Sequence, residues 1–222
     1  MSRKYLFIET DGKVYLESKD GRLDLPAATS RLPFKVQTRS GFTVLGAQVE
    51  YAKPELDRHP EEWLDKDLIP SMDEATPLAR AAVLATMHRL VTNAIILDGD
   101  RVLLVKANRG LAAGWWNVPG GFIEWDEAPL ACLKRELKEE LGIVVADAEL
   151  LTIETQKFDA SPYHMLAFVY LVRASGQPLV LDRTELDQAA WFRIGQAAKE
   201  TKNPFARKGL AIVAERLKAA KP

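Results

Sequence analysis

Residues 121–143 read GFIEWDEAPLACLKRELKEELGI, and this stretch decides the fold around it. Asp126 is a residue type that caps the N-terminus of a helix, and Pro129 falls in the first turn, where its missing N–H costs little. Gly142 suits the left-handed conformation that often follows a helix. The sequence therefore predicts a helix from about residue 126 to residue 141.

The predicted helix has an apolar stripe beside an acidic face. At about 100° per residue, four leucines share one face and three glutamates share the next: Leu130, Leu133, Leu137 and Leu141, then Glu136, Glu139 and Glu140. Carboxylates at this spacing repel one another by roughly a few tenths of a kcal/mol per pair, and a bound cation would reverse that cost. Hard oxygen ligands favour Mg²⁺ or Mn²⁺. The alternative is a solvated face with Lys134 and Lys138 as salt-bridge partners.

The same stretch resembles the Nudix box, whose pattern is G-x5-E-x7-R-E-U-x-E-E-x-G-U, with U a bulky aliphatic residue. Every specified position is matched, by Gly121, Glu127, Arg135, Glu136, Leu137, Glu139, Glu140, Gly142 and Ile143. The resemblance implies an α/β fold, an α/β/α sandwich around a mixed sheet, from about Val91 to the C-terminus. It does not cover residues 1–90.

The resemblance also implies an enzyme that hydrolyses a diphosphate linkage with the help of one to three divalent ions, Mg²⁺ or Mn²⁺. Each matched residue then has an expected role. Glu136 and Glu140 are the metal ligands, and the carbonyl of Gly121 completes the metal shell. Glu139 is either a further ligand or the base that takes a proton from water. Glu127 and Arg135 pair to hold the loop against the helix.

A carboxylate outside the box often assists in enzymes of this family, a few residues before a tryptophan that opens a late strand. Glu185 lies six residues before Trp191 and is the first candidate. Glu154, within an expected strand, is the competing candidate. Cys132 lies in the box helix, where a lone cysteine is more often packing than chemistry. We assign Cys132 no role.

Substrate contacts are expected from aromatic and basic residues outside the box, because bases stack on aromatic rings and phosphates attract cations. The candidates are Trp116, Phe158, Tyr163, Lys106 and Arg109; Trp115 and His164 lie close by in the sequence. Each could instead serve packing or lie in solvent. We expect a nucleotide-type small molecule, either a nucleotide sugar, a dinucleotide or a nucleoside triphosphate.

The rest of the chain divides near residue 90. Short β-like runs separated by Asp-Gly and Ser-Gly turns predict a small β-meander in the first fifty residues. Helical spacing follows from Pro54 to Leu90, in two segments separated by Ile69-Pro70-Ser71. Residues 91–222 are the expected Nudix domain, with a hairpin at Asp98-Gly99-Asp100, strands near 148–155, 164–173 and 189–194, and a final helix from Pro204. The segment 1–90 would extend the substrate pocket or form a homodimer interface.

Composition excludes several classes of partner. The 222 residues are 47% hydrophobic and 27% charged with a net charge of −1, so no global field recruits nucleic acid or a membrane surface. The apolar run from Tyr5 to Ile8 is too short for a signal-peptide core, and one cysteine excludes an intramolecular disulfide. We expect a cytoplasmic protein.

Two other functions use a similar fold. A Nudix-like sensor binds a nucleotide sugar to regulate transcription without turnover, and it usually carries a degraded box with an attached DNA-binding domain. An isopentenyl diphosphate isomerase would need a catalytic cysteine in the substrate loop, whereas Cys132 is inside the box helix. The intact box favours the hydrolase.

Overall fold

The computed structural model describes residues 4–58, 60–110, 112–157, 164–173 and 176–219. The chain forms two compact units, Met1–Met87 and His88–Pro222, and each is described by itself. Among the described residues, no helix combines the length and the apolar character needed to cross a membrane.

The first unit is built on a five-stranded sheet whose order is β5-β6-β1-β2-β7. Its strands are β1 (Lys4–Thr10), β2 (Lys13–Tyr15), β5 (Lys35–Val44), β6 (Ala47–Glu55) and β7 (Leu64–Asp65), with a separate hairpin of β3 (Glu17–Lys19) and β4 (Arg22–Asp24). The β-structure predicted here is present, but it is not a simple meander, because β1 pairs with β6 in parallel. A parallel pair requires a crossover connection, and the local turn signals do not reveal it.

The helix predicted from Pro54 to Leu68 is wrong. This segment holds the end of β6 and the short strand β7, followed by a 3-10 turn, η1 (Ile69–Ser71). Pro60 would interrupt a helix, and Trp63 is buried against the rings of Tyr15 and Phe34. The second predicted helical segment contains α1 (Pro77–Ala85), which the hydroxyl of Thr76 caps by accepting the Ala79 N–H at 3.2 Å.

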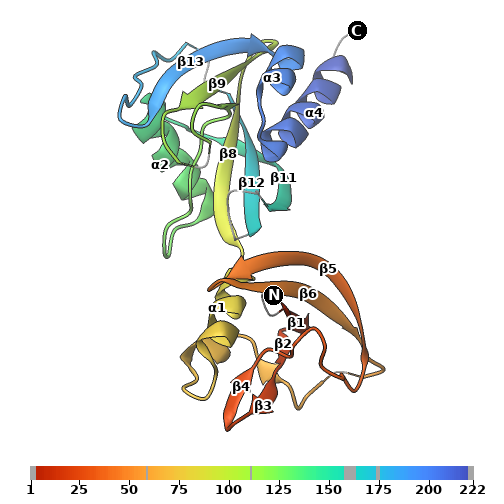
Figure 1. The fold of residues 1–222 in the computed structure, drawn as a ribbon. Coiled ribbons are helices and arrows are strands. Elements are labelled where there is room, and N and C mark those ends of the chain that lie inside the picture. Colours follow the sequence, from red (N-terminus) through yellow and green to blue (C-terminus); the bar gives the residue numbers. More distant parts are fainter. Residues whose placement is uncertain (1–3, 59, 111, 158–163, 174–175, 220–222) are drawn as a thin grey trace. The chain divides into compact units, whose positions relative to one another are not determined.

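The second unit contains a mixed six-stranded sheet between two layers of helices (Figure 1). The strands are β8 (Arg89–Asp98), β9 (Arg101–Ala107), β10 (Trp116–Asn117), β11 (Ala148–Lys157), β12 (His164–Arg173) and β13 (Leu186–Arg193). The order is β10-β9-β8-β12-β11, and β13 pairs with β9 outside this path. Strand β8 is parallel to β12, and the other pairs are antiparallel.

Alternating residues of β8 separate the two helical layers. Ile95 packs in the cluster that contains Phe205 and Val213 of α4 (Pro204–Ala219), near α3 (Ile194–Glu200). Its neighbour Ile96 packs in the cluster that contains Leu133 and other leucines of α2 (Pro129–Leu141). Successive side chains of a strand point to opposite faces, so the sheet has an apolar core on both sides. The architecture is the α/β/α sandwich expected from the sequence.

Helix α2 begins later than predicted. Its N-cap is Ala128, without a side-chain cap, and Pro129 is the first helical residue. Asp126 does not cap the helix but adopts a left-handed backbone with φ 61°. The C-terminal prediction is confirmed, since Gly142 has φ 69°. Leu130 is 37% exposed rather than part of the apolar stripe, and the buried position in the first turn is Cys132.

Candidate active site

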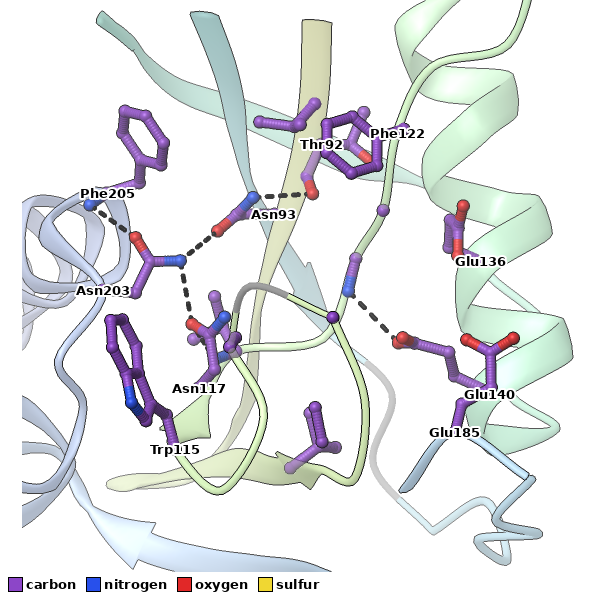
Figure 2. Close-up of a pocket in the computed structure, with 18 of the residues that line it drawn as sticks. Thr92, Asn93, Trp115, Asn117, Phe122, Glu136, Glu140, Glu185, Asn203 and Phe205 are labelled. Carbon is purple, nitrogen blue, oxygen red and sulfur yellow. Dashed lines mark hydrogen bonds between the residues drawn. The ribbon is translucent and has the colours of Figure 1, made fainter. Parts of the chain in front are cut away.

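A cavity of about 460 Å³ opens beside the box helix. Its lining comes from β8 and β9, the loop that leads from Trp115 to Phe122, the acidic face of α2, Glu185 before β13, and the start of α4. Figure 2 shows carboxylates on one side and asparagine amides on the other, with the chain from Asn117 to Phe122 between them. The cavity therefore combines an acidic half and an amide half.

The acidic half is built on one turn of α2. Glu136 and Glu140 are four residues apart, and both side chains line the cavity. Burial is the main cause that raises the pKa of each, and the negative charge of Glu136 helps to raise the pKa of Glu140 to about 8. The backbone N–H of Gly120 donates to Glu140 Oε2 at 3.2 Å. Negative charge is thus concentrated where water is partly excluded.

Two glycines let the backbone approach this half closely. A Cβ on Gly121 would lie 2.2 Å from the carboxylate of Glu136, and a Cβ on Gly120 would lie 2.2 Å from the carbonyl oxygen of Thr92. Gly120 also has φ 139°, a conformation that suits glycine. The carbonyl of Gly121 accepts the Thr92 N–H at 2.9 Å. That carbonyl is thus bonded to β8 with one of its two lone pairs, and the metal contact expected of it stays a prediction.

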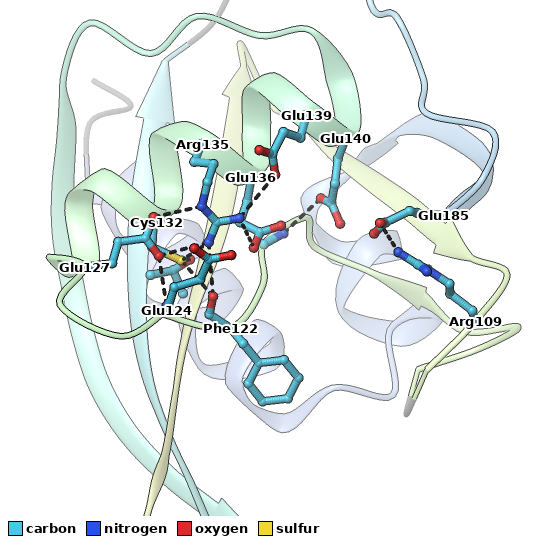
Figure 3. Close-up of polar contacts among 12 residues, drawn as sticks. Arg109, Phe122, Glu124, Glu127, Cys132, Arg135, Glu136, Glu139, Glu140 and Glu185 are labelled. Atoms are coloured by element: carbon cyan, nitrogen blue, oxygen red, sulfur yellow. Dashed lines mark hydrogen bonds and ion pairs between the residues drawn. The ribbon is translucent and has the colours of Figure 1, made fainter.

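Arg135 holds the loop before α2 against the helix (Figure 3). It donates to both oxygens of Glu127, and its Nη1 donates to Glu136 at 2.8 Å and to Glu139 at 3.1 Å. The hydrogen bond from Arg135 is the main cause that lowers the pKa of Glu127 to about 2. Glu139 is 59% exposed and does not line the cavity. In this conformation Glu139 is bonded to Arg135 and shares the Nη1 donor with Glu136.

Of the two auxiliary carboxylates considered, Glu185 lies at the cavity. Strand β13 pairs with β9, and Asn108 N–H donates to the Glu185 carbonyl at 2.9 Å, which brings the loop beside the box helix. Its side chain forms an ion pair with Arg109, which also lines the cavity. Glu154 instead pairs with Lys208 of α4 and accepts a hydrogen bond from Thr152 at 2.9 Å. It does not line the cavity.

The expected aromatic contacts are only partly placed at the cavity. Trp116 packs edge-on against Phe192 at 5.1 Å between ring centroids, in the core on the α4 side of the sheet, whereas its neighbour Trp115 lines the cavity. The two differ because successive residues of an extended chain face opposite ways. Lys106 does not line the cavity. Phe158 and Tyr163 lie outside the described residues, so the structure does not place them.

The amide half of the cavity was not foreseen. Asn203 Nδ2 donates to Asn93 Oδ1 at 3.0 Å and to Asn117 Oδ1 at 2.9 Å, so one amide from each of three distant segments meets here (Figure 2). Asn93 and Asn203 are 7% exposed. The one local signal was an asparagine directly before Pro204, a pattern typical of a helix start, and it did not indicate a pocket.

Comparison with known proteins identifies the family of this fold and site. The family model of the NUDIX domain matches residues 87–211. The chain belongs to the Nudix family. The match includes the whole box and the segments that supply the cavity.

Similar Nudix proteins include hydrolases of several kinds. The chain is 31% identical over 100 residues to the NAD-capped RNA hydrolase NudC of Pseudomonas aeruginosa, covering 45% of this chain and 34% of that protein. It is 31% identical over 106 residues to the human 8-oxo-dGDP phosphatase NUDT18, covering 46% of this chain and 31% of that protein. The similarity thus spans about a third of these relatives.

Solved structures agree on the fold. A MutT Nudix hydrolase from Burkholderia pseudomallei is 33% identical with a TM-score of 0.50, covering 57% of this chain and 98% of that one. The Nudix domain of Shewanella oneidensis NrtR, solved with ADP ribose, is 21% identical with a TM-score of 0.52, covering 60% of this chain and 90% of that one. The second likeness concerns the fold alone.

Nudix hydrolases generally use divalent metals, and the acidic half of this cavity has the chemistry for one. Two carboxylates with raised pKa values share a partly buried site, and Glu185 adds to the negative potential at both. Hard oxygen donors of this kind suit Mg²⁺ or Mn²⁺. Within the described residues, however, no three acidic, histidine or cysteine side chains already stand in a metal-holding arrangement. Glu139 faces Arg135, so a third donor would require a side-chain rotation or a water molecule.

Proposed function

We propose that the protein hydrolyses a diphosphate linkage in a nucleotide-type substrate with the help of Mg²⁺, with Mn²⁺ as a possible substitute. The observation that carries this proposal is the pair Glu136 and Glu140, partly buried side by side in a cavity with their pKa values raised. One contact from Arg135 to Glu136 and one backbone N–H to Glu140 only partly offset the cost of ionising two carboxylates in such a place. A cation that binds there removes the cost and supplies the positive charge that a diphosphate needs.

Glu136 and Glu140 would hold the cation. A bound divalent ion neutralises the diphosphate oxygens and lowers the pKa of a water molecule. The water oxygen forms a bond to phosphorus while the bond from phosphorus to the bridging oxygen breaks, and the bridging oxygen leaves with the second phosphoryl group. Glu185, at the cavity wall, is the group that we assign to take the proton of the water. Glu139 is the alternative base if it turns away from Arg135.

Arg109 would bind the phosphates of the substrate. The Arg109 side chain is 64% exposed, lines the cavity and contacts Glu185, so it is within reach of a substrate bound at the carboxylates. A guanidinium binds phosphate oxygens in two-point fashion. Arg135, by contrast, is occupied with Glu127 and Glu136 and is a positioning residue.

The proposed substrate class is argued from the part of the cavity outside its acidic half. Its walls include Trp115, Phe122 and Phe205, which offer aromatic surface for a base, and its volume suits a small molecule. The names of the relatives, an NAD-capped RNA hydrolase and an 8-oxo-dGDP phosphatase, both describe nucleotides that carry a diphosphate. A nucleotide sugar, a dinucleotide and a nucleoside triphosphate remain the three candidate kinds of substrate.

The test is a hydrolysis screen over these three kinds of nucleotide with Mg²⁺ or Mn²⁺, and the released phosphates are separated by chromatography. Activity should disappear with excess chelator and return when the ion is restored. Undiminished turnover of a verified substrate in excess chelator would contradict the mechanism. Tight binding of a nucleotide sugar without hydrolysis would favour the sensor instead.

The role of residues 1–90 is a separate proposal. This segment would either extend the substrate pocket or form a homodimer. Light scattering of the full chain decides the second possibility. A monomer at all concentrations would leave the pocket extension, and deletion of the first unit should then raise KM without abolishing kcat.

A further inference from the structure

The hydrogen-bond polarity of the three cavity amides is fixed by the backbone. The N–H of Val118 donates to the Asn117 side chain at 2.8 Å, so the receiving atom is oxygen. The N–H of Phe205 donates to the Asn203 side chain at 2.9 Å, so that atom is oxygen as well. Both donors are backbone groups whose direction cannot be exchanged. The usual ambiguity between amide oxygen and nitrogen is therefore removed at both positions.

The remaining amide follows from these two. Since Asn203 presents its oxygen to Phe205, its nitrogen faces Asn93 and Asn117 and donates to both oxygens. The nitrogen of Asn93 then donates to the carbonyl of Thr92 at 2.7 Å, and a carbonyl can only accept. Every link of the network has one consistent direction. Reversal of any amide would oppose two donors or two acceptors in a place with little water.

Asn117 is the member of the network that still has hydrogen bonds to offer. Its oxygen already accepts two, from Val118 and Asn203, which uses both lone pairs. In the described part of the chain no hydrogen bond from its nitrogen is found, and no buried polar side-chain atom lacks a partner. The Asn117 nitrogen is therefore accessible, on a half-buried residue that lines the cavity. The Asn117 nitrogen thus presents to the cavity a hydrogen-bond donor for which the described residues supply no acceptor.

We propose that Asn117 makes the site selective for a 6-oxopurine nucleotide over an adenine nucleotide. This inference rests on the proposed nucleotide-binding function. Adenine presents an N6 donor beside the N7 acceptor, and an asparagine pairs with it by using both its nitrogen and its oxygen. A 6-oxopurine presents two acceptors, O6 and N7, on the same edge. Because the oxygen of Asn117 already accepts two hydrogen bonds, Asn117 can only donate to a base. The edge of a 6-oxopurine, with its two acceptors, fits this donor. The N6 amino group of adenine would find no acceptor there.

The surroundings of Asn117 suit a purine. Trp115, Phe122 and Phe205 line the same cavity, so a base can stack while its edge meets the amide. The carboxylates occupy the other side of the chain from Asn117 to Phe122 (Figure 2). This arrangement would place the base at the amides and the phosphates at Glu136 and Glu140.

The test compares inosine and adenosine 5′-monophosphates, which differ at the six-position edge and have no diphosphate to hydrolyse. Their dissociation constants are measured by calorimetry on the full chain with Mg²⁺ present. We expect the wild type to bind the inosine nucleotide about tenfold more tightly, the size of a well-placed base contact. In Asn117→Asp one carboxylate oxygen keeps both accepted hydrogen bonds and the other presents an acceptor to the cavity. The preference should then reverse towards adenosine monophosphate.

The ratio of the two constants is the readout, because an added negative charge weakens both nucleotides alike. Gln196→Glu, on an exposed position of α3 outside the cavity, is the control for charge and should keep the wild-type ratio. Thermal melting checks that each variant is folded. Equal affinities in the wild type, an unchanged ratio in Asn117→Asp, or no binding of either nucleotide would each overturn the proposal. A selective site without hydrolysis of any diphosphate would instead defeat the proposed function and leave this inference intact.

Discussion

The guanidinium of Arg135 holds the carboxylate of Glu127 at two points, with Nε 2.8 Å from Oε1 and Nη2 2.9 Å from Oε2. These residues are eight positions apart, one in the loop before α2 and one in its second turn. Because the same guanidinium also donates to Glu136, the pair connects the shape of the loop to the direction of a site carboxylate. Arg135 and Glu127 thus stabilise the geometry on which the proposed metal binding depends.

Glu127→Gln should lower Tm by about 2–4 °C at neutral pH, because a charge-assisted two-point contact is lost. The folded state lowers the pKa of Glu127 from 4.5 to about 2. This stabilisation is therefore present above pH 4.5 and is lost as pH falls towards 2. Melting curves across the acid range should show that the difference in Tm between the wild type and Glu127→Gln becomes smaller as the pH falls. Glu124→Gln in the same loop is the control, and a gap that stays constant down to low pH would exclude the ion pair as its source.

Glu140→Gln should reduce kcat by about a hundredfold or more while the protein stays folded, because the amide keeps the shape and removes the ligand charge. Steady-state kinetics on the substrate found in the hydrolysis screen provide the measurement. Glu149→Gln removes one negative charge from an exposed strand position and should leave kcat unchanged. A folded Glu140→Gln protein with near wild-type kcat would show that this carboxylate is not a ligand.

The stability of the metal-free protein should fall as pH rises. Burial and the charge of Glu136 raise the pKa of Glu140 from 4.5 to about 8, so the folded state favours the neutral acid. That contribution is fully present below 4.5 and is lost as pH passes through 8. In chelator, Tm should drop by about 3 °C or more between pH 6 and pH 9. The drop in Tm should be smaller in Glu140→Gln, and it should shrink in the wild type when Mg²⁺ is added. Equal drops in the wild type and in Glu140→Gln would show that Glu140 is not the cause.

Gly121→Ala should weaken metal use more than stability. Its Cβ would lie 2.2 Å from the carboxylate of Glu136, which must swing away while the backbone stays. We expect the Mg²⁺ concentration for half-maximal activity to rise about tenfold or more. Gly195→Ala is the matched control, since a Cβ there meets no atom within 4 Å. An unchanged Mg²⁺ requirement in Gly121→Ala would mean that Glu136 is not needed for the ion.

Glu185→Gln should lower kcat by about a hundredfold with Tm close to that of the wild type, because its side chain is at the cavity and partly exposed. Glu154→Gln should keep kcat, since its carboxylate pairs with Lys208 away from the cavity. Kinetics and melting curves of the two variants separate the candidates. A large loss at Glu154 with none at Glu185 would move the auxiliary carboxylate to β11.

Patterns within one element predicted the structure well. The Asp98-Gly99 turn joins β8 to β9, α2 ends at Leu141 directly before Gly142, and α4 starts at Pro204 as expected. Predictions failed where a residue depended on a distant partner. The segment around Trp63 has helical spacing, yet it forms turns and the two-residue strand β7, with Trp63 buried against Tyr15 and Phe34. The parallel pairing of β1 with β6 also joins segments about forty residues apart.

The sequence by itself determined the family and the carboxylates, because the box is a local pattern: the helix period alone places Glu136 and Glu140 on one face. Tertiary structure decided which other groups join them. The pairing of β13 with β9 brings Glu185 to the cavity, and chain folding brings Asn203 against Asn93 across 110 positions. Helix period is a property of neighbouring residues, whereas strand order and the meeting of the three amides depend on hydrogen bonds between segments that are distant in the chain.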